Sequence, residues 1–109
     1  MKIAVTYENG QVFQHFGHTA QFKLYDVENG AVVSSKVVDT NGSGHGALAG
    51  FLAANGVDSL ICGGIGGGAQ MALAEAGIQL YAGCSGDADA CVAQLLEGTL
   101  QFAQAATCD

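Results

Sequence analysis

The second half of the chain alternates short apolar runs with segments of helical periodicity, and glycine-rich turns separate them. Val57–Cys62 and Ile78–Tyr81 are compact apolar runs that are typical of buried strands. Between them, Ala69–Ala76 repeats its apolar residues at the spacing of one helix face. Because an alternation of strands and helices needs crossover connections, this half predicts parallel strands covered by helices.

The first half of the chain predicts antiparallel strands instead. Lys2–Tyr7 is a short run rich in β-branched residues and predicts the first strand. Phe22–Val27 and Ala31–Val38 predict two more strands, joined by Asn29-Gly30, a pair that favours a tight hairpin. Since crossovers are right-handed, the later strands lie beside the first, which predicts a mixed five-stranded sheet in the order 3-2-1-4-5 with strand 2 antiparallel.

Two further helices complete the predicted α/β architecture. Leu48, Phe51 and Leu52 repeat at helical spacing, and the glycine at position 56 suits the end of that helix. Asp87–Glu97 predicts the last helix, with acidic residues in its first turn that favour the helix dipole. The 109 residues fit a single domain, and the tail at 105–109 is expected to be loose.

The charge balance excludes several classes of partner. The formal net charge is −7, and the basic side chains are three lysines with no arginine. Because binding to nucleic acid depends on clustered basic side chains, we expect no nucleic-acid partner. No apolar run approaches the roughly 20 residues that a membrane span needs, and no signal-peptide pattern precedes the first strand. We therefore expect a cytoplasmic protein with reduced thiols and no membrane partner.

The glycine-rich loop after Val57–Cys62 is the first candidate for a binding site. In open α/β sheets, ligands bind outside the carboxyl ends of the parallel strands. The loop has few side chains, so its N–H groups can point at an anion where a helix begins. The alternative is that glycine serves only a tight turn, and no Lys-Ser/Thr pair follows to make a P-loop. The candidate binding residues of the loop are Gly63, Gly64, Gly66 and Gly67.

Three histidines are candidate ligands. His15 and His18 are three residues apart in the irregular segment Gln11–Gln21, where both imidazoles can reach one metal ion or point to opposite sides. His45 stands between two glycines before a predicted helix, where it is either a ligand or an exposed residue at the helix start. This pattern leaves a simple zinc site open as one alternative.

The four cysteines divide into core residues and one candidate ligand. No Cys-x-x-Cys pair occurs, so zinc-ribbon and thioredoxin-like sites are excluded. Cys62 ends an apolar strand and Cys91 lies on an apolar helix face, so both are expected in the core. Cys84 lies in a turn of small residues near a helix N-terminus, where a thiolate is favoured, and it is the predicted sulfur ligand. Cys108 lies in the tail and has no assigned role.

No residue set supports hydrolytic chemistry. Two-metal nucleases need several carboxylates around paired cations, and the predicted strand ends carry no such cluster. No serine or cysteine stands in a nucleophile elbow, and no base is evidently paired with one. The sequence therefore predicts a binding protein rather than an enzyme.

Three short motifs occur in order along the chain. They are His15–Gly17, the glycine/histidine stretch Gly42–Gly46, and Gly63–Gly66. Together they resemble motifs of the dinitrogenase iron–molybdenum cofactor biosynthesis family, which includes NifX, NifY and the C-terminal part of NifB. The similarity covers about residues 2–97. Relatives commonly have an arginine directly after the first motif, where this chain has His18.

The resemblance implies a ribonuclease H-like, three-layer α/β/α fold without nuclease activity. It implies binding, storage or delivery of an anionic iron–sulfur or molybdenum–iron–sulfur cluster, with cluster-biosynthesis proteins as partners. The implied cluster contacts are His15, His45 and the backbone of the 63–68 loop, and His18 and Cys84 complete the candidate metal ligands. The alternatives are a module for a small anion or a simple metal ion such as zinc, and a ligand-free partner-interaction domain.

Overall fold

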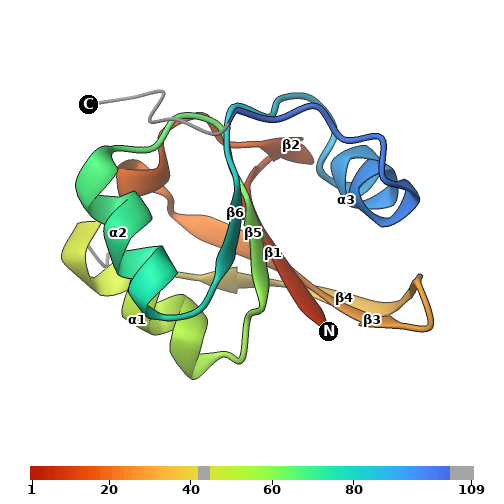
Figure 1. Ribbon diagram of the computed structural model, residues 1–109, viewed down its shortest axis with the longest axis horizontal. Helices are drawn as coiled ribbons and strands as arrows, with labels where there is room; N and C mark the ends of the chain where they lie inside the picture. Colours follow the sequence, from red (N-terminus) through yellow and green to blue (C-terminus); the bar gives the residue numbers. More distant parts are fainter. Residues whose placement is uncertain (42–44, 104–109) are drawn as a thin grey trace.

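A single mixed sheet carries helices on both of its faces (Figure 1). The computed structural model describes residues 1–41 and 45–103. In this part of the chain, no helix is long and apolar enough to cross a membrane. In chain order, the elements are β1 (Lys2–Glu8), β2 (Gln11–Val12), the 3₁₀ helix η1 (Phe16–His18), β3 (Gln21–Glu28), β4 (Ala31–Asp39), α1 (His45–Ala54), β5 (Ser59–Ile61), α2 (Gly67–Glu75), β6 (Gln79–Tyr81) and α3 (Ala88–Glu97).

The strands follow the order β4–β3–β1–β5–β6, and β2 pairs with β1 beside this path. β3 runs antiparallel to β1 and β4, whereas β5 and β6 run parallel to β1. The mixed α/β class is confirmed, but the sheet differs from the predicted five-stranded order because it contains the sixth strand β2. Two residues are too few to show an alternating pattern, so the sequence did not reveal this strand.

The predicted hairpin between the second and third long strands is confirmed. Asn29 and Gly30 have φ angles of 53° and 76°, so both lie in the left-handed region that a tight two-residue turn requires. This turn joins β3 to β4, and their pairing runs from Gln21 opposite Asp39 to Glu28 opposite Ala31. Asparagine and glycine adopt these angles more easily than other residues, so the turn sets the register of the hairpin.

The two faces of the sheet bury separate cores. Strand alternation sends Ala4 of β1 to one core and its neighbours Ile3 and Val5 to the other. The first core includes Leu48 of α1 and Leu73 of α2, and the second includes Cys91 and Val92 of α3. Figure 1 accordingly shows α1 and α2 on one side of the sheet and α3 on the other. The assignment to the ribonuclease H-like fold in particular stays a prediction.

Helix boundaries follow local capping chemistry. Asp87 is the N-cap of α3 rather than its first residue, because its carboxylate accepts a hydrogen bond from the Ala90 N–H at 2.8 Å. α2 begins at Gly67, two residues before the predicted periodic segment, and Gly66 is its N-cap. The helix therefore starts inside the glycine-rich loop, which matters for the candidate site below.

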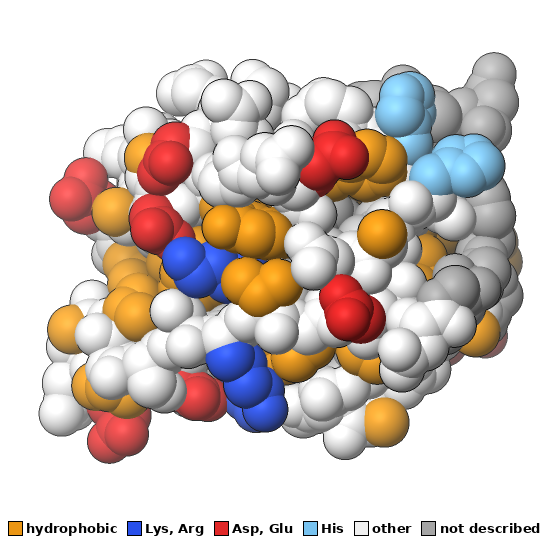
Figure 2. All heavy atoms as spheres, turned by 180° about the vertical axis from the view of Figure 1, so that it is seen from behind, with side chains coloured by type: hydrophobic (Ala, Val, Ile, Leu, Met, Phe, Trp, Pro, Cys, Tyr) orange, Lys and Arg blue, Asp and Glu red, His pale blue; other side chains and the backbone are white. Residues whose placement is uncertain are grey.

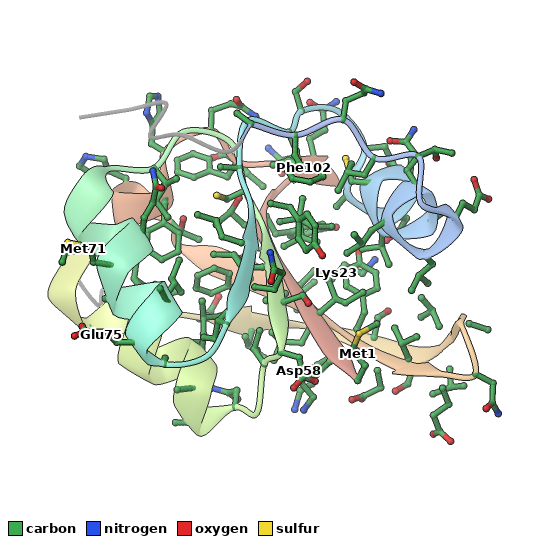
Figure 3. The ribbon with its side chains drawn as sticks, viewed as in Figure 1. Met1, Lys23, Asp58, Met71, Glu75 and Phe102 are labelled. Carbon is green, nitrogen blue, oxygen red and sulfur yellow. The ribbon has the colours of Figure 1, made fainter. Side chains whose placement is uncertain are left out.

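An ion pair joins Lys23 of β3, labelled in Figure 3, to Asp89 of α3. The Lys23 Nζ donates to Asp89 Oδ1 at 2.8 Å, and the Tyr25 hydroxyl donates to the same oxygen at 2.6 Å. The hydrogen bond from Lys23 has the larger effect and that from Tyr25 the smaller, and together they hold the pKa of the Asp89 carboxyl below its usual value of 3.8. Burial, together with the Asp89 charge, raises the pKa of Tyr25.

We expect Asp89→Asn to remove a small, pH-dependent part of the stability. Because the folded-state pKa of Asp89 is depressed, its contribution is present above the unfolded-state pKa and is lost as pH falls through the folded-state value. The Asp89 side chain is 65% exposed, so solvent screening limits the contribution to about 0.2–1 kcal/mol. Urea unfolding of both proteins should show this difference at neutral pH and little difference in strong acid. An equal difference at both pH values would contradict the assignment.

Candidate functional site

Backbone hydrogen bonds join three loops at the carboxyl ends of β1, β5 and β6. The Gly64 N–H donates to the Gln14 carbonyl at 2.7 Å, and the Phe16 N–H donates to the Gly64 carbonyl at 3.0 Å. On the other side, the Gly83 N–H donates to the Gly63 carbonyl at 2.9 Å. The parallel ladder thus continues beyond the sheet, with His15 bridged to Gly64. Segments far apart in the sequence are held together at the predicted edge of the sheet.

Gly63 is required by close packing against Gln14. A Cβ atom at position 63 would lie 2.7 Å from the Gln14 Cα and 2.6 Å from its Oε1. The Gln14 Nε2 in turn donates to the Cys84 carbonyl at 3.1 Å and to the Val12 carbonyl at 3.2 Å. Gln14 therefore ties the three loops together, a role that no motif or periodicity in the sequence indicated.

The glycine-rich loop divides into a packed half and an open half. The N–H of Gly64 is engaged with Gln14 inside the protein and is not offered to a ligand, contrary to the expectation for this residue. Gly67 and Gly68 are exposed, and a Cβ atom at either position would meet nothing within 4 Å. The N-cap residue Gly66 makes no side-chain capping hydrogen bond. The amino end of α2 is the part of the loop that is open to a ligand.

His15 is the N-cap of the short helix η1 and His18 is its last residue, and this helix lies next to the loop. Both side chains are exposed, whereas Phe16 between them is buried in the first core. The His15 ring lies edge-on to the Phe13 ring, with 6.1 Å between their centroids. Figure 2 shows the histidine side chains gathered at one corner of the molecule. The buried phenylalanine thus fixes the segment and leaves the imidazoles at the surface.

The third predicted histidine begins α1, but its surroundings lie outside the described residues. His45 is the first residue of that helix, and its side chain is not among those described. Residues 42–44, which complete the glycine/histidine motif, also lie outside the described part. The contact of His45 with the other two histidines therefore stays a prediction.

The described residues do not assemble a conventional protein-ligated metal site. Within residues 1–41 and 45–103, no three histidine, cysteine, aspartate or glutamate side chains gather closely enough to hold a metal ion. Residues 13–20, 62–68 and 82–86 contain no aspartate, glutamate, lysine or arginine. Structural zinc sites use four protein ligands and catalytic ones three, so the described side chains do not form either kind. The loops offer imidazoles and backbone N–H groups instead.

The surroundings of Cys84 do not favour the thiolate that its sequence position suggested, whereas its role as a sulfur ligand stays a prediction. Cys84 is buried in the second core, and its thiol donates to the Tyr81 carbonyl at 3.5 Å and to the Gln101 carbonyl at 3.6 Å. Burial, followed by the influence of Cys91, raises the pKa of the Cys84 thiol to about 11. Desolvation outweighs the nearby start of α3, whose N-cap is itself an acidic residue. Cys62 and Cys91 are buried as predicted.

These features define a small mixed α/β domain with a candidate binding site in the loops at one end of its sheet. The chain belongs to the dinitrogenase iron–molybdenum cofactor family, which matches residues 1–98. The resemblance drawn from the three motifs is therefore confirmed. Membership of this family indicates a cofactor-related binding role.

Similar proteins match over nearly the whole chain. The uncharacterized protein MJ0580 of Methanocaldococcus jannaschii is 32% identical over 106 residues, which cover 93% of this chain and 90% of that protein. The crystal structure of PH0822 has a TM-score of 0.89 at 26% identity, covering 95% of this chain and 96% of that one. The apo form of the orange protein from Desulfovibrio gigas has a TM-score of 0.84 at 28% identity, covering 97% and 95%.

Proposed function

We propose that this protein binds, stores or delivers an anionic iron–sulfur or molybdenum-containing cluster without catalysing a reaction. The observation that carries the proposal is the backbone β-bridge between His15 and Gly64. It occurs in a chain whose family is named for the iron–molybdenum cofactor of dinitrogenase. The bridge ties an exposed imidazole to the loop that leads into the open amino end of α2. His18 lies in the same segment, and His45 at the start of α1 is a further candidate contact. Cluster-biosynthesis proteins in the cytoplasm are the partners that fit this role.

The chemistry of the loops suits an anionic, sulfide-rich ligand. An imidazole nitrogen is a good ligand for iron, and N–H groups at a helix start can hydrogen-bond sulfide or oxo edges. The absence of charged carboxylates from residues 13–20, 62–68 and 82–86 keeps the acidic charge of the chain out of these loops. The net charge of −7 therefore does not exclude an anionic ligand at this end of the sheet.

Anaerobic reconstitution tests the proposal. The full chain is incubated with ferrous iron and sulfide in one arm and with tetrathiomolybdate in another, and then desalted. We expect visible charge-transfer absorption to elute with the protein, and His15→Ala to weaken binding by about tenfold, the equivalent of 1.4 kcal/mol. Lys36→Ala is the matched control, because Lys36 is exposed on β4, away from the loops.

Two results would overturn this proposal. One is the absence of absorption in both arms, and the other is equal binding by wild type and the double variant His15→Ala, His18→Ala. One tight zinc ion bound without sulfide would favour the simple metal-ion module instead. Metal and sulfide analysis of the protein after anaerobic purification separates these results.

A further inference from the structure

The two edges of the sheet are not alike. Near the β6 edge, the Ala103 N–H donates to the Ala82 carbonyl at 2.7 Å, and the Phe102 ring packs edge-on against Tyr81 with 4.9 Å between centroids. A chain segment therefore covers the end of that edge. On the opposite side, no segment within residues 1–41 and 45–103 pairs with the outer edge of β4. A long open edge is a template for another strand.

β4 also carries most of the apolar surface that the described chain exposes on its sheet. Val32, Val33 and Val37 are 44%, 56% and 43% exposed. The other large exposed apolar side chains of the described chain are isolated from one another and lie outside β4; they are those of Met1, Met71 and Phe102. The β3–β4 hairpin extends away from α1 and α2 (Figure 1). Edge strands are normally protected by prolines or by several charges. β4 has no proline, and Lys36 is its only charged residue before Asp39.

The sequence of β4 has the symmetry of a strand that pairs with its own copy. Two valines precede the polar stretch from Ser34 to Lys36, and two valines follow it. If two β4 strands run antiparallel about Ser35, Val33 of each copy lies opposite Val37 of the other. Lys36 then lies opposite Ser34, so no like charges face each other, whereas an axis at Lys36 would oppose two lysines.

We propose that two copies of the chain associate through antiparallel pairing of their β4 strands, with the twofold axis at Ser35. The interface is isologous, as in most homodimers, and the two sheets become one. A register shift between Asp26 and Val27 leaves Val33 as the extra residue of β4, so a bulge twists this end of the strand. The pairing is centred on Ser35, so that residues 32–38 of one copy face residues 38–32 of the other, and the association depends on protein concentration. The inference does not depend on the proposed cluster site, which lies in the loops.

Sedimentation velocity of the full chain over a range of concentrations tests the association. We expect a monomer–dimer equilibrium that salt strengthens, because each copy carries a net charge of −7 and screening reduces their repulsion. Val37→Lys should shift the equilibrium to monomer, with its circular dichroism and Tm unchanged. Met71→Lys should still dimerise, because Met71 is 68% exposed on α2 and points away from the core (Figure 3). A wild-type monomer at all concentrations, or a Val37→Lys dimer like wild type, would overturn the proposal.

A cysteine at the axis tests the register. In a background with Cys108→Ser, Ser35→Cys brings two thiols face to face only if the axis passes through that position. Mild oxidation should then give a covalent dimer in high yield, whereas Met71→Cys should give little. Equal cross-linking of the two variants would contradict the proposed register. The remaining native thiols are buried and do not compete for the oxidant.

Discussion

Gly63→Ala is expected to lower the free energy of unfolding by about 1–3 kcal/mol, the usual cost of overpacking a closely packed position. The added methyl group would lie 2.7 Å from the Gln14 Cα, which is a backbone atom and cannot rotate away. Relief requires the 13–16 segment to separate from the loop after β5. That movement stretches the hydrogen bond from the Gly64 N–H to the Gln14 carbonyl and loosens the bridge between Gly64 and His15.

Gly68→Ala is the matched control for this prediction. Position 68 lies in the first turn of α2, and a Cβ atom there meets nothing within 4 Å. Alanine favours a helix over glycine by about 0.5–1 kcal/mol, so this variant should be neutral or slightly more stable. Urea unfolding of both variants makes the comparison. Equal stabilities would contradict the division of the loop into a packed half and an open half.

The packed and open halves of the glycine-rich loop show which features of the site the sequence could predict and which it could not. The strand–helix alternation predicted the loop and its place at the carboxyl edge of the sheet, because apolar periodicity is a local signal. The role of each glycine was beyond such reasoning. Gly63 is needed because Gln14, distant in the sequence, packs against it, and only a three-dimensional contact reveals that. Gly67 has no such neighbour, although it is a glycine of the same loop and the sequence alone does not distinguish it from Gly63.

The thiol of Cys84 illustrates a second limit. A turn of small residues before a helix predicted a low pKa, because the helix dipole is inferred from sequence position. Burial depends instead on the residues that cover the turn. The thiol is covered and donates a hydrogen bond to the Gln101 carbonyl, and its burial raises the pKa of Cys84 to about 11. His15 and His18 lie in one segment of the sequence, but their arrangement follows from Phe16, whose burial no motif specified.

Phe16→Ala is expected to have the largest effect on stability, a loss of about 3–5 kcal/mol. The side chain is 1% exposed, and its ring lies 6.3 Å from that of Phe22, which in turn stacks on Phe51 at 5.9 Å. Truncation removes the burial of an aromatic ring and leaves a cavity beneath η1. Phe102→Ala is the control, because that ring is 39% exposed, and its loss should cost much less. Equal costs in urea unfolding would contradict the anchoring role of Phe16.

The same variant separates the ligand-binding role of His15 from the packing that holds it. Phe16 is the first residue of η1, and its carbonyl accepts hydrogen bonds from the Thr19 N–H at 3.1 Å and from the Thr19 hydroxyl at 2.7 Å. A cavity at Phe16 frees this turn to move, so the imidazoles of His15 and His18 lose the positions that the turn gives them, although neither residue is mutated. We therefore expect weaker cluster binding in Phe16→Ala under conditions where it is folded. Phe16→Leu, which keeps most of the buried volume, should recover both stability and binding. Recovery of stability without binding would show that the ring itself, and not only its packing, supports the site.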